Sequence, residues 1–294
     1  MPNSTLHAGL IGAGIQASRS PAMHMGEARA LGLDLVYELF DLDRIETGAA
    51  ALPALLADLR RRNYLGVNIT YPVKQTVLEL LDSYSDDVGA LGACNTVIFH
   101  NGRAIGHNTD WVGFAQNMGR GIPGASLDHV VQLGGGGAGS AVTYALIKMG
   151  ARHITIHERD GTRAQAFVRR FQALAGEATT VSLSRDLEKD LGAATGLVNC
   201  TPVGMHKYPG TPIAPELLRT ELWVADIVYV PLQTQLLLAA AAKGCRILGG
   251  GGMAVFQAAE ALHLFTGRAP DPERMLARFE QDTKAEPLAG YGSQ

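Results

Sequence analysis

Short apolar runs alternate with stretches of helical periodicity along the chain, which is typical of α/β proteins. Asn101-Gly102 lies between two apolar runs and predicts a tight β-hairpin. Because a proline follows Ser20, we expect this serine to cap a helix. For the first part of the chain, the predicted strands are 8–12, 35–42, 64–70, 96–99 and 104–106, and the predicted helices are 20–31, 47–62, one beginning at Pro72, and 110–118.

The alternation continues in the second part of the chain. The predicted strands there are 129–133, 154–157, 197–200, 223–229 and 246–248, and the predicted helices are 140–149, 163–175 and 254–265. We therefore predict two α/β domains: an N-terminal substrate-binding domain and a Rossmann-type dinucleotide-binding domain, with a C-terminal helical return to the first. Residues 1–113 and 253–294 form the substrate-binding domain, and residues 114–252 the Rossmann domain. No flexible linker is visible, so we expect long helices to join the two domains, with the active site in the cleft between them.

Composition narrows the class of protein. The 294 residues are 47% hydrophobic and 18% charged, which excludes a disordered chain. The net charge of −3 offers no electrostatic case for a nucleic acid or a membrane surface as partner. The N-terminus lacks the pattern of a signal peptide, and the apolar stretch 236–242 is too short to span a bilayer. Cys94, Cys200 and Cys245 show no CxxC spacing, so we expect buried, reduced thiols and a cytoplasmic enzyme.

Glycine is in excess, at 35 residues, and one cluster of it suggests a nucleotide site. Gly134, Gly136 and Gly139 satisfy GxGxxG between a predicted strand and a predicted helix. Glu158 follows about 20 residues later, where a ribose-binding carboxylate is expected. Glycines let the backbone turn tightly and approach a pyrophosphate at the start of a helix. The alternative is a glycine-rich turn that only packs a helix against a sheet, and the whole βαβ context favours the dinucleotide site.

The residues after the next strand predict NAD over NADP. A carboxylate at Glu158 accepts hydrogen bonds from the ribose hydroxyls but repels a 2′-phosphate. Asp160 adds a second negative charge. Arg159 and Arg163 favour a phosphate instead, because guanidinium binds phosphate well.

Three polar clusters follow strands of the first domain, where open α/β sheets bind their ligands. They are 18–20, 68–74, and Asn95 together with 106–110. Hydroxyls, amides, one ammonium and one carboxylate suit a small, polyhydroxylated, anionic substrate. The nine histidines form no metal-binding pattern, so we read them as structural and expect no metal.

Seven collinear segments make the chain resemble the shikimate dehydrogenase family, and most closely its NAD-dependent quinate/shikimate branch. They are Gly12–Pro21 ending in SRSP, Asn68–Lys74 (NITYPVK), Gly92–Thr96 (GACNT), Gly106–Phe114 (GHNTDWVGF), the glycine loop, Asn199–Met205 (NCTPVGM) and Gly250–Gln257 (GGGMAVFQ). The resemblance implies oxidation of the C3 hydroxyl of shikimate, or of quinate, to a ketone. It covers most of the chain.

The resemblance also implies roles for individual residues. Lys74 and Asp110 match the catalytic pair, with Lys74 exchanging the proton at the reacting hydroxyl. Ser18 and Ser20 match residues that hold the substrate carboxylate, and Tyr229 matches a position near substrate and nicotinamide. Residues that match binders of the ring hydroxyls are Asn68, Thr70, Asn95 and Gln257. The predicted cofactor-binding residues are Gly134, Gly136, Gly137, Ala138, Gly139, Glu158, Arg159, Arg163, Thr201, Pro202, Val203, Met205, Val228, Gly251 and Met253.

Three of these residues, Lys74, Asp110 and Ser20, also have a structural interpretation. Most lysines are solvated surface groups, but we expect Lys74 one turn into a helix that begins at a strand end, beside polar residues. Asp110 would also serve as an N-cap, and Ser20 shares that ambiguity, which makes Ser18 the clearer substrate ligand.

Two departures from the family pattern bear on specificity. NADP-dependent members carry Asn-Arg-Thr where this chain has Glu158-Arg159-Asp160, which favours NAD. The quinate/shikimate branch often has Thr where this chain has Ser20, so we expect shikimate as the substrate and leave the acceptance of quinate open. Two other interpretations stay open: an aminoshikimate-type or related dehydrogenase, and a sensor that binds a dinucleotide and a metabolite without turnover. Monomer and homodimer are equally compatible with the sequence.

Overall fold

The computed structural model describes residues 5–285, which form two units. Unit 1 contains residues 5–109 and 255–284, and unit 2 is built mainly from residues 110–254. The division falls inside one helix, α9 (Gly251–Thr266). The assignment of residues 1–113 and 253–294 to substrate binding and of 114–252 to dinucleotide binding stays a prediction, and residues 286–294 lie outside the described part of the chain.

Within the described residues, unit 1 is built around a six-stranded sheet with the spatial order β2-β1-β3-β5-β6-β4. Strands β1, β2 and β3 are parallel, and β5 runs antiparallel to β3 and β6. The strands are β1 Leu6–Gly12, β2 Leu35–Asp41, β3 Gly66–Ile69, β4 Ser83–Tyr84, β5 Thr96–His100 and β6 Arg103–His107. The predicted hairpin is confirmed, since Asn101 (φ 50°) and Gly102 (φ 73°) form the left-handed turn between β5 and β6.

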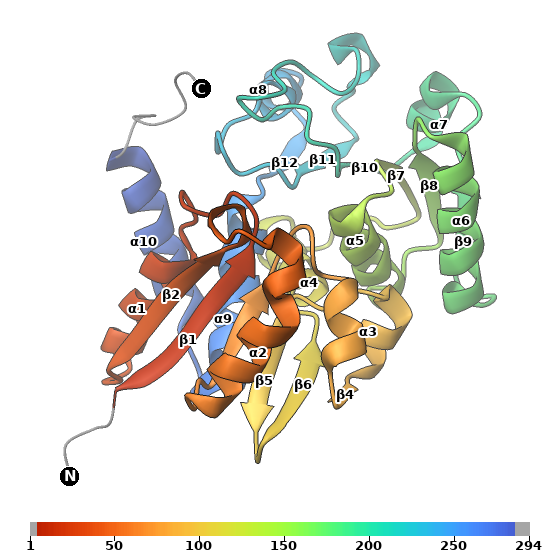
Figure 1. Ribbon diagram of the computed structural model, residues 1–294. Helices are drawn as coiled ribbons and strands as arrows, with labels where there is room; N and C mark the ends of the chain where they lie inside the picture. The colour runs from red at the N-terminus through yellow and green to blue at the C-terminus, as the bar shows by residue number, and fades with distance from the viewer. Residues whose placement is uncertain (1–4, 286–294) are drawn as a thin grey trace. The chain divides into compact units, whose positions relative to one another are not determined.

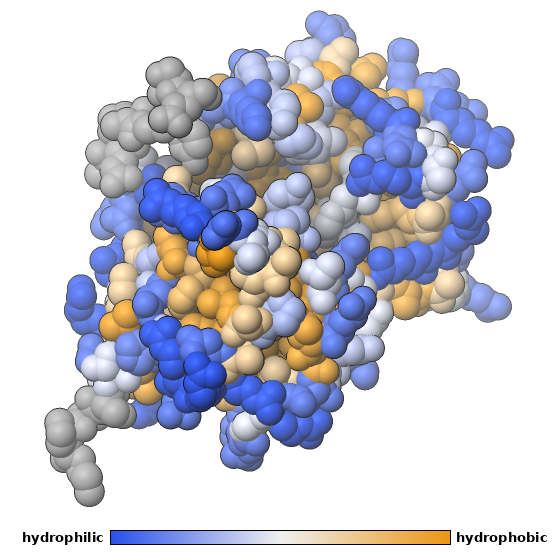
Figure 2. All heavy atoms as spheres, in the orientation of Figure 1, coloured by the Kyte–Doolittle hydropathy of each residue, from blue (hydrophilic) through white to orange (hydrophobic). Residues whose placement is uncertain are grey.

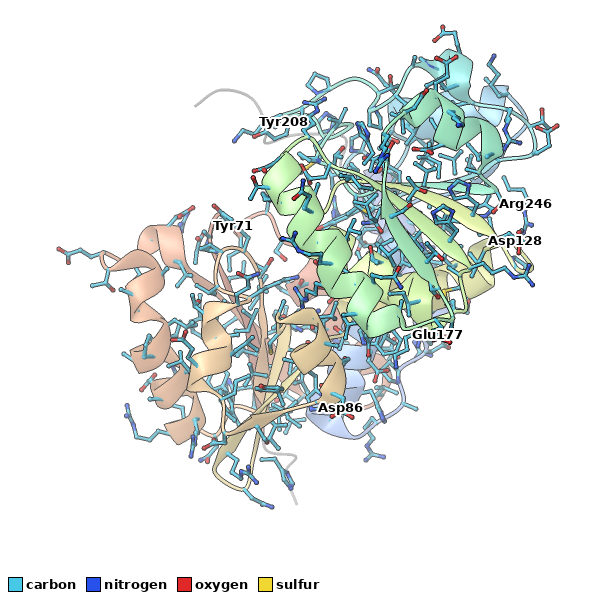
Figure 3. All side chains as sticks on the ribbon, turned by 90° about the vertical axis from the view of Figure 1, so that its right-hand side faces the viewer. Tyr71, Asp86, Asp128, Glu177, Tyr208 and Arg246 are labelled. Carbon is cyan, nitrogen blue, oxygen red and sulfur yellow. The ribbon has the colours of Figure 1, made fainter. Side chains whose placement is uncertain are left out.

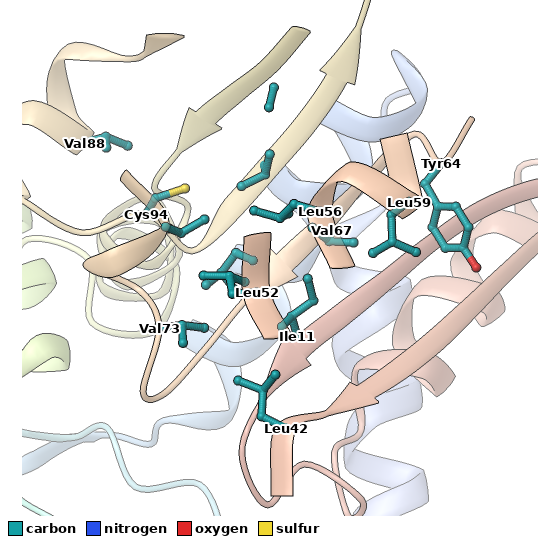
Figure 4. Packing of buried hydrophobic residues seen from close by; sticks show 14 residues of the cluster. Ile11, Leu42, Leu52, Leu56, Leu59, Tyr64, Val67, Val73, Val88 and Cys94 are labelled. Atoms are coloured by element: carbon teal, nitrogen blue, oxygen red, sulfur yellow. The ribbon is translucent and has the colours of Figure 1, made fainter. Parts of the chain in front are cut away.

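Helices cover both faces of this sheet (Figure 1). On one face, Leu52, Leu56 and Leu59 of α2 pack on Ile11 and Val67 (Figure 4). On the other face, α1 and α9 bury Ala8, Leu10 and Tyr37. The helices are α1 Ser20–Ala30, α2 Leu52–Arg61, α3 Asp86–Leu91 and α10 Pro272–Ala285, with short 3-10 turns η1 Leu42–Arg44, η2 Gly48–Ala51 and η3 Thr76–Leu80.

Unit 2 has a second sheet, which is parallel throughout, with the order β12-β11-β10-β7-β8-β9 in the described chain. Counted along the chain from β7, this is the 3-2-1-4-5-6 order of dinucleotide-binding sheets. The strands are β7 His129–Leu133, β8 His153–His157, β9 Thr180–Leu183, β10 Gly196–Asn199, β11 Trp223–Asp226 and β12 Arg246–Leu248. The remaining elements are α4 Asp110–Gly121, α5 Gly137–Lys148, α6 Gly161–Ala175, α7 Leu187–Ala193, η4 Pro215–Leu217 and α8 Gln235–Ala242. The predicted α/β class is confirmed.

The sequence analysis did not predict several of these helices, and α10 illustrates the reason. Met275, Leu276 and Phe279 give it a buried face, but its attachment depends on a distant carboxylate. Glu27 of α1 is 2% exposed and accepts hydrogen bonds from the backbone N–H of Asp271 (2.7 Å) and from Arg274 Nη2 (2.6 Å). A buried charge is tolerated when it is paired in this way.

One predicted helix cap and one predicted helix are wrong. Ser20 does not cap α1, because Arg19 occupies the N-cap position and no side chain caps the helix. No helix begins at Pro72: a turn joins Val73 N–H to the Thr70 carbonyl, and only η3 follows. The Lys74 carbonyl accepts from the backbone N–H of Cys94 (2.8 Å), so a tertiary contact takes the group that a helix would need. The predicted helix 47–62 is η2 followed by α2, and the predicted strand 223–229 ends at Asp226.

Figure 2 shows hydrophilic residues interspersed with apolar patches on the face that it draws. No helix among the described residues is long and apolar enough to cross a membrane.

His24 in unit 1 is expected to make the protein acid-sensitive. Its ring is fully buried, stacks on Tyr37 (4.4 Å between centroids), and neither ring nitrogen has a hydrogen-bond partner among the described residues. Burial lowers the pKa of His24 from 6.5 to about 3. Below pH 6.5 the His24 ring binds a proton in the unfolded chain but not in the folded one. His24 therefore costs no stability above pH 6.5, and below that pH it lowers the free energy of unfolding by about 1 kcal/mol per pH unit.

Denaturant unfolding at pH 7.5, 6 and 5 measures this dependence. In His24→Phe, which keeps a stacked ring, the free energy of unfolding should fall less steeply with acid than in the wild type. Equal slopes for the two proteins would contradict the assignment to His24.

Candidate active site

The carboxyl ends of β1 and β3 bring the predicted substrate residues of unit 1 together. These two parallel strands are neighbours in the sheet, and β2 lies on the other side of β1. Ser18 and Ser20 follow β1, and Thr70 and Lys74 follow β3. The chain passes from β1 to β2 on one side of β1 and then returns to β3 on its other side. The strand order therefore reverses at β1, and an open α/β sheet binds its ligand at the carboxyl end of the strands at such a point.

A buried hydrogen-bond network connects three predicted substrate ligands. Asn68 Nδ2 donates to Thr96 Oγ1 (2.9 Å), and Thr96 Oγ1 donates to Asn95 Oδ1 (3.0 Å). Asn95 Nδ2 donates to Thr109 Oγ1 (3.0 Å) and to Gln257 Oε1 (3.3 Å). The amide side chains are therefore held in one orientation each, as a site for a polyhydroxylated ligand requires.

Tyr37, which the sequence analysis did not single out, extends this network to the two serines. Its hydroxyl donates to Asn68 Oδ1 (2.7 Å) and is also hydrogen-bonded to Ser20. Ser18 Oγ donates in turn to Ser20 Oγ (3.1 Å) and accepts from the Ser20 backbone N–H (3.2 Å). Burial raises the pKa of Tyr37 well above its usual value, so the phenol stays a hydrogen-bond donor. No local pattern marks this tyrosine, since it lies within an apolar strand.

Lys74 is half-buried in the turn between β3 and η3 rather than in a helix. The backbone on both sides of it is anchored, by Val73 to Thr70 and by the Lys74 carbonyl to Cys94. Burial raises the pKa of the Cys94 thiol to about 12, although the Lys74 charge opposes the shift. Tyr71 in the same loop is 75% exposed and stands away from the sheet (Figure 3).

Asp110 is the first residue of α4 and therefore not the residue that flanks the helix, as an N-cap would be. Its position depends on Thr109, whose backbone N–H donates to Asn95 Oδ1 (2.7 Å). A carboxylate in the first turn is also stabilised by the helix dipole. Thr109 is 1% exposed, and the sequence analysis placed it in the polar cluster 106–110 without giving it a role.

In unit 2, the glycine loop lies between β7 and α5, at the point where the strand order reverses. Gly134 has a left-handed backbone (φ 91°), which favours glycine. A Cβ on Gly139 would lie 2.4 Å from the Gly134 carbonyl oxygen, so the third glycine is required by close packing. A Cβ on Gly136 or Gly137 would meet nothing within 4 Å. The loop thus combines a compact base with an open outer side, which fits the approach of a pyrophosphate.

Glu158 lies beside this loop. Its Oε2 accepts from the Gly135 backbone N–H (2.9 Å) and its Oε1 from the Asp160 N–H (3.2 Å). Burial alone would raise the pKa of Glu158, but these N–H groups and the charge of Arg163 outweigh it and lower the pKa. Glu158 is therefore a carboxylate at neutral pH. Asp160 caps α6 through the N–H groups of Thr162 and Arg163, which gives it a structural role.

A second buried network supports the loops after β10 and β11. Asp226 is 1% exposed and accepts from Asn199 Nδ2 (2.9 Å), from Thr234 Oγ1 (2.7 Å) and from the Val228 N–H (3.0 Å). Asn199 also accepts from the Thr201 N–H (3.0 Å). Burial raises the pKa of Asp226, and the three hydrogen bonds partly offset the shift.

This network places several predicted cofactor residues on anchored loops of unit 2. Asn199 Nδ2 donates to the Val203 carbonyl (3.0 Å), which fixes the loop after β10. In that loop Met205 is exposed, and so is Tyr208, which Figure 3 shows well away from the amino ends of the strands marked by Asp128 and Arg246. Asn199 belongs to one of the quoted segments, but only the fold shows that it bonds to Asp226. Of the remaining predicted residues, Pro202 is exposed, Val228 is buried and Tyr229 is 40% exposed.

The second glycine cluster has a packing role. A Cβ on Gly252 would lie 1.9 Å from Asn117 Oδ1 of α4, and one on Gly250 would lie 2.3 Å from the Ile227 carbonyl oxygen. The predicted cofactor residues Gly251 and Met253 lie in the first turn of α9, beside these contacts.

The three cysteines, and the histidines at the starts of β7 and β8, have structural roles. Cys94, Cys200 and Cys245 are free thiols and buried, as predicted. His129 and His153 stack at 4.4 Å and bond to Thr155 and Ser182 respectively. Among residues 5–285 no three histidine, cysteine or acidic side chains form a group suited to a metal ion.

Comparison with known proteins identifies relatives along nearly the whole chain. Residues 10–97 match the family model for the shikimate dehydrogenase substrate binding domain. The shikimate dehydrogenase (NADP(+)) of Streptomyces avermitilis is 50% identical over 270 residues, 92% of this chain and 93% of that protein. The quinate/shikimate dehydrogenase (NAD(+)) of Corynebacterium efficiens is 43% identical over 281 residues, 95% of this chain and 99% of that protein. The structure of quinate dehydrogenase from Corynebacterium glutamicum in complex with NAD superposes with a TM-score of 0.90 at 43% identity, over 94% of this chain and 99% of that one.

Proposed function

The chain belongs to the shikimate dehydrogenase family, and we propose that it is an NAD-dependent enzyme that reversibly oxidises the C3 hydroxyl of shikimate to a ketone. Activity of the shikimate/quinate dehydrogenase type and a nicotinamide dinucleotide as cofactor follow from the relatives and from the matching fold. The choice of NAD, the substrate preference and the residue roles go beyond these findings, and we propose them.

The observation that carries the proposal is the ordered set of amides and hydroxyls in unit 1. Asn68, Asn95 and Gln257 are hydrogen-bonded into one network, beside the hydroxyls of Ser18 and Ser20. We assign the amides and Thr70 to the ring hydroxyls of the substrate and the two serines to its carboxylate. Such groups recognise a small polyol acid by hydrogen bonds.

The proton is assigned to Lys74. Oxidation of a secondary alcohol releases a hydride from carbon and a proton from the hydroxyl, and the bound dinucleotide would supply the hydride acceptor. We propose that Lys74 takes the proton during oxidation and returns it during ketone reduction, with Asp110 as the second member of the pair. Tyr229 is proposed to line the site near the substrate.

The loops after β7, β10 and β11 of unit 2 are suited to binding the dinucleotide. The open outer side of the loop at Gly136 and Gly137 leaves room for a pyrophosphate at the start of α5, and Ala138 lies in the same turn. Thr201, Val203 and Met205 after β10, and Val228 after β11, are proposed to contact the nicotinamide half. The buried, reduced cysteines fit the cytoplasm that we propose as the place of action.

The NAD preference rests on Glu158. This carboxylate beside the glycine loop is charged at neutral pH, so it would accept the ribose hydroxyls and repel a 2′-phosphate. Arg159 and Arg163 are exposed and would favour the phosphate. Relatives named for NADP and for NAD both match the chain, so the preference is a property to be measured.

Steady-state kinetics with both cofactors tests the proposal. We expect kcat/KM on shikimate to be at least about tenfold higher with NAD⁺ than with NADP⁺, since a charged group discriminates by one or more kcal/mol. Quinate and an aminoshikimate complete the substrate panel. A higher kcat/KM with NADP⁺ would overturn the cofactor assignment, activity only on another cyclohexane acid would overturn the substrate, and dinucleotide binding without any reduction would indicate a sensor.

A further inference from the structure

Gln132 is a buried polar residue in an otherwise apolar strand, directly before the glycine loop. It is 0% exposed on β7, between Val131 and Leu133, which are buried too. A buried amide is costly unless its hydrogen bonds are made. Here they are: Gln132 Nε2 donates to the carbonyl oxygens of Gly134 (2.9 Å) and Gly139 (3.1 Å).

The two glycine carbonyls fix the orientation of this amide, and Thr143 satisfies its oxygen. The Thr143 hydroxyl, also 0% exposed, donates to Gln132 Oε1 (2.8 Å). Turning the amide by 180° would place Oε1 against two carbonyl oxygens, neither of which can donate. Because burial excludes water as a substitute partner, only one orientation satisfies all three contacts.

The two carbonyls belong to the first and third glycines of GxGxxG. Gly134 opens the loop in a left-handed conformation, and Gly139 lies inside α5, packed against the Gly134 carbonyl. Gln132 therefore ties the two ends of the loop to one side chain of the strand beneath. The turn between them holds Gly136 and Gly137, whose outer side is open.

We propose that Gln132, supported by the hydrogen bond from Thr143, is a positioning residue for dinucleotide binding. It holds the loop in the shape in which its backbone N–H groups converge on the pyrophosphate. The inference rests on the proposed function, since it presumes that unit 2 binds a nicotinamide dinucleotide. A residue that acts only on this loop affects the affinity for the dinucleotide and leaves the affinity for the substrate unchanged.

Gln132→Leu tests the role, because it replaces the amide by an apolar side chain one atom shorter and removes all three hydrogen bonds. We expect the Kd for NADH, measured by fluorescence titration, and the KM for the dinucleotide to rise about tenfold to a hundredfold. The KM for shikimate at saturating dinucleotide should stay within about twofold of the wild type.

Thr143→Val provides an independent variant of nearly unchanged shape. It leaves the buried Gln132 Oε1 without its donor and holds the side chain less firmly, so the Kd for NADH should rise in the same direction by a smaller factor. The double variant Gln132→Leu/Thr143→Val should bind no more weakly than Gln132→Leu alone, because Thr143 acts through Gln132. If Gln132→Leu does not fold, Thr143→Val carries the test by itself.

Gln172→Leu is the matched control. Gln172 on α6 also makes three hydrogen bonds, to the carbonyls of Gly176 and Thr179 and from the Val181 N–H, away from the glycine loop. Its Kd for NADH should equal that of the wild type. An unchanged Kd in Gln132→Leu, an unchanged Kd in Thr143→Val where that variant carries the test, or an equal rise in Gln172→Leu overturns the inference while the proposed function stands. Failure of the wild type to bind NADH overturns both.

Discussion

Lys74→Ala is expected to lower kcat for shikimate oxidation by about a hundredfold to ten-thousandfold, the usual contribution of a general acid–base group. The variant should remain folded, because alanine keeps the backbone contact of this residue. The Lys74 carbonyl accepts from the Cys94 N–H at 2.8 Å, and alanine keeps that carbonyl. Steady-state kinetics and thermal melting, run side by side, measure the two expectations.

A surface lysine offers the control for charge. Lys243 follows α8 and is exposed. Lys243→Ala removes the same ammonium group and should leave kcat unchanged within about twofold, as surface substitutions generally do. A near-normal kcat in Lys74→Ala would remove Lys74 from the proton transfer, and the acid–base role would have to be assigned to another group.

Glu158→Gln is expected to shift cofactor preference toward NADP by about tenfold to a hundredfold, measured as the ratio of kcat/KM with NAD⁺ to that with NADP⁺. Glutamine keeps an oxygen that accepts from the Gly135 N–H, so the loop contact survives while the negative charge is lost. The neighbouring Arg159 and Arg163 then face a 2′-phosphate without an opposing carboxylate from Glu158.

Glu177→Gln serves as the control, since Glu177 lies beyond the other end of α6 (Figure 3) and is exposed. Its cofactor ratio should equal that of the wild type. If Glu158→Gln also keeps the wild-type ratio, the carboxylate has no part in discrimination, and the arginines or the shape of the pocket would have to decide it.

Local signals predicted much of the fold correctly. The Asn101-Gly102 hairpin, the glycine loop and the buried strands of unit 2 depend on residues close together in the chain. Their conformations are dictated by left-handed turn residues and by runs of apolar side chains. Prediction failed where a distant group intervened: the Cys94 N–H engages the Lys74 carbonyl, and Glu27 holds α10 through Arg274.

The candidate site divides in the same way. Residues at strand ends, such as Ser18, Lys74 and Glu158, were predicted because loops after parallel strands face the ligand in this class of fold. Their roles in binding and catalysis remain predictions. Tyr37, Asp226 and Gln132 were missed, since each lies in an apolar strand. Thr109 lies in the polar cluster 106–110 but was given no role. The importance of all four comes only from their hydrogen-bond partners.

The sequence by itself therefore determined the α/β class, the nucleotide loop and the chemical types available for a polyol acid and a dinucleotide. Only the tertiary structure decided which side chain orients which. Asn95 and Gln257 are 162 residues apart and are joined by one hydrogen bond of 3.3 Å. The physical reason is that turn and strand preferences act between neighbours in the chain, whereas a buried amide takes its orientation from whatever donors and acceptors the folded core places around it.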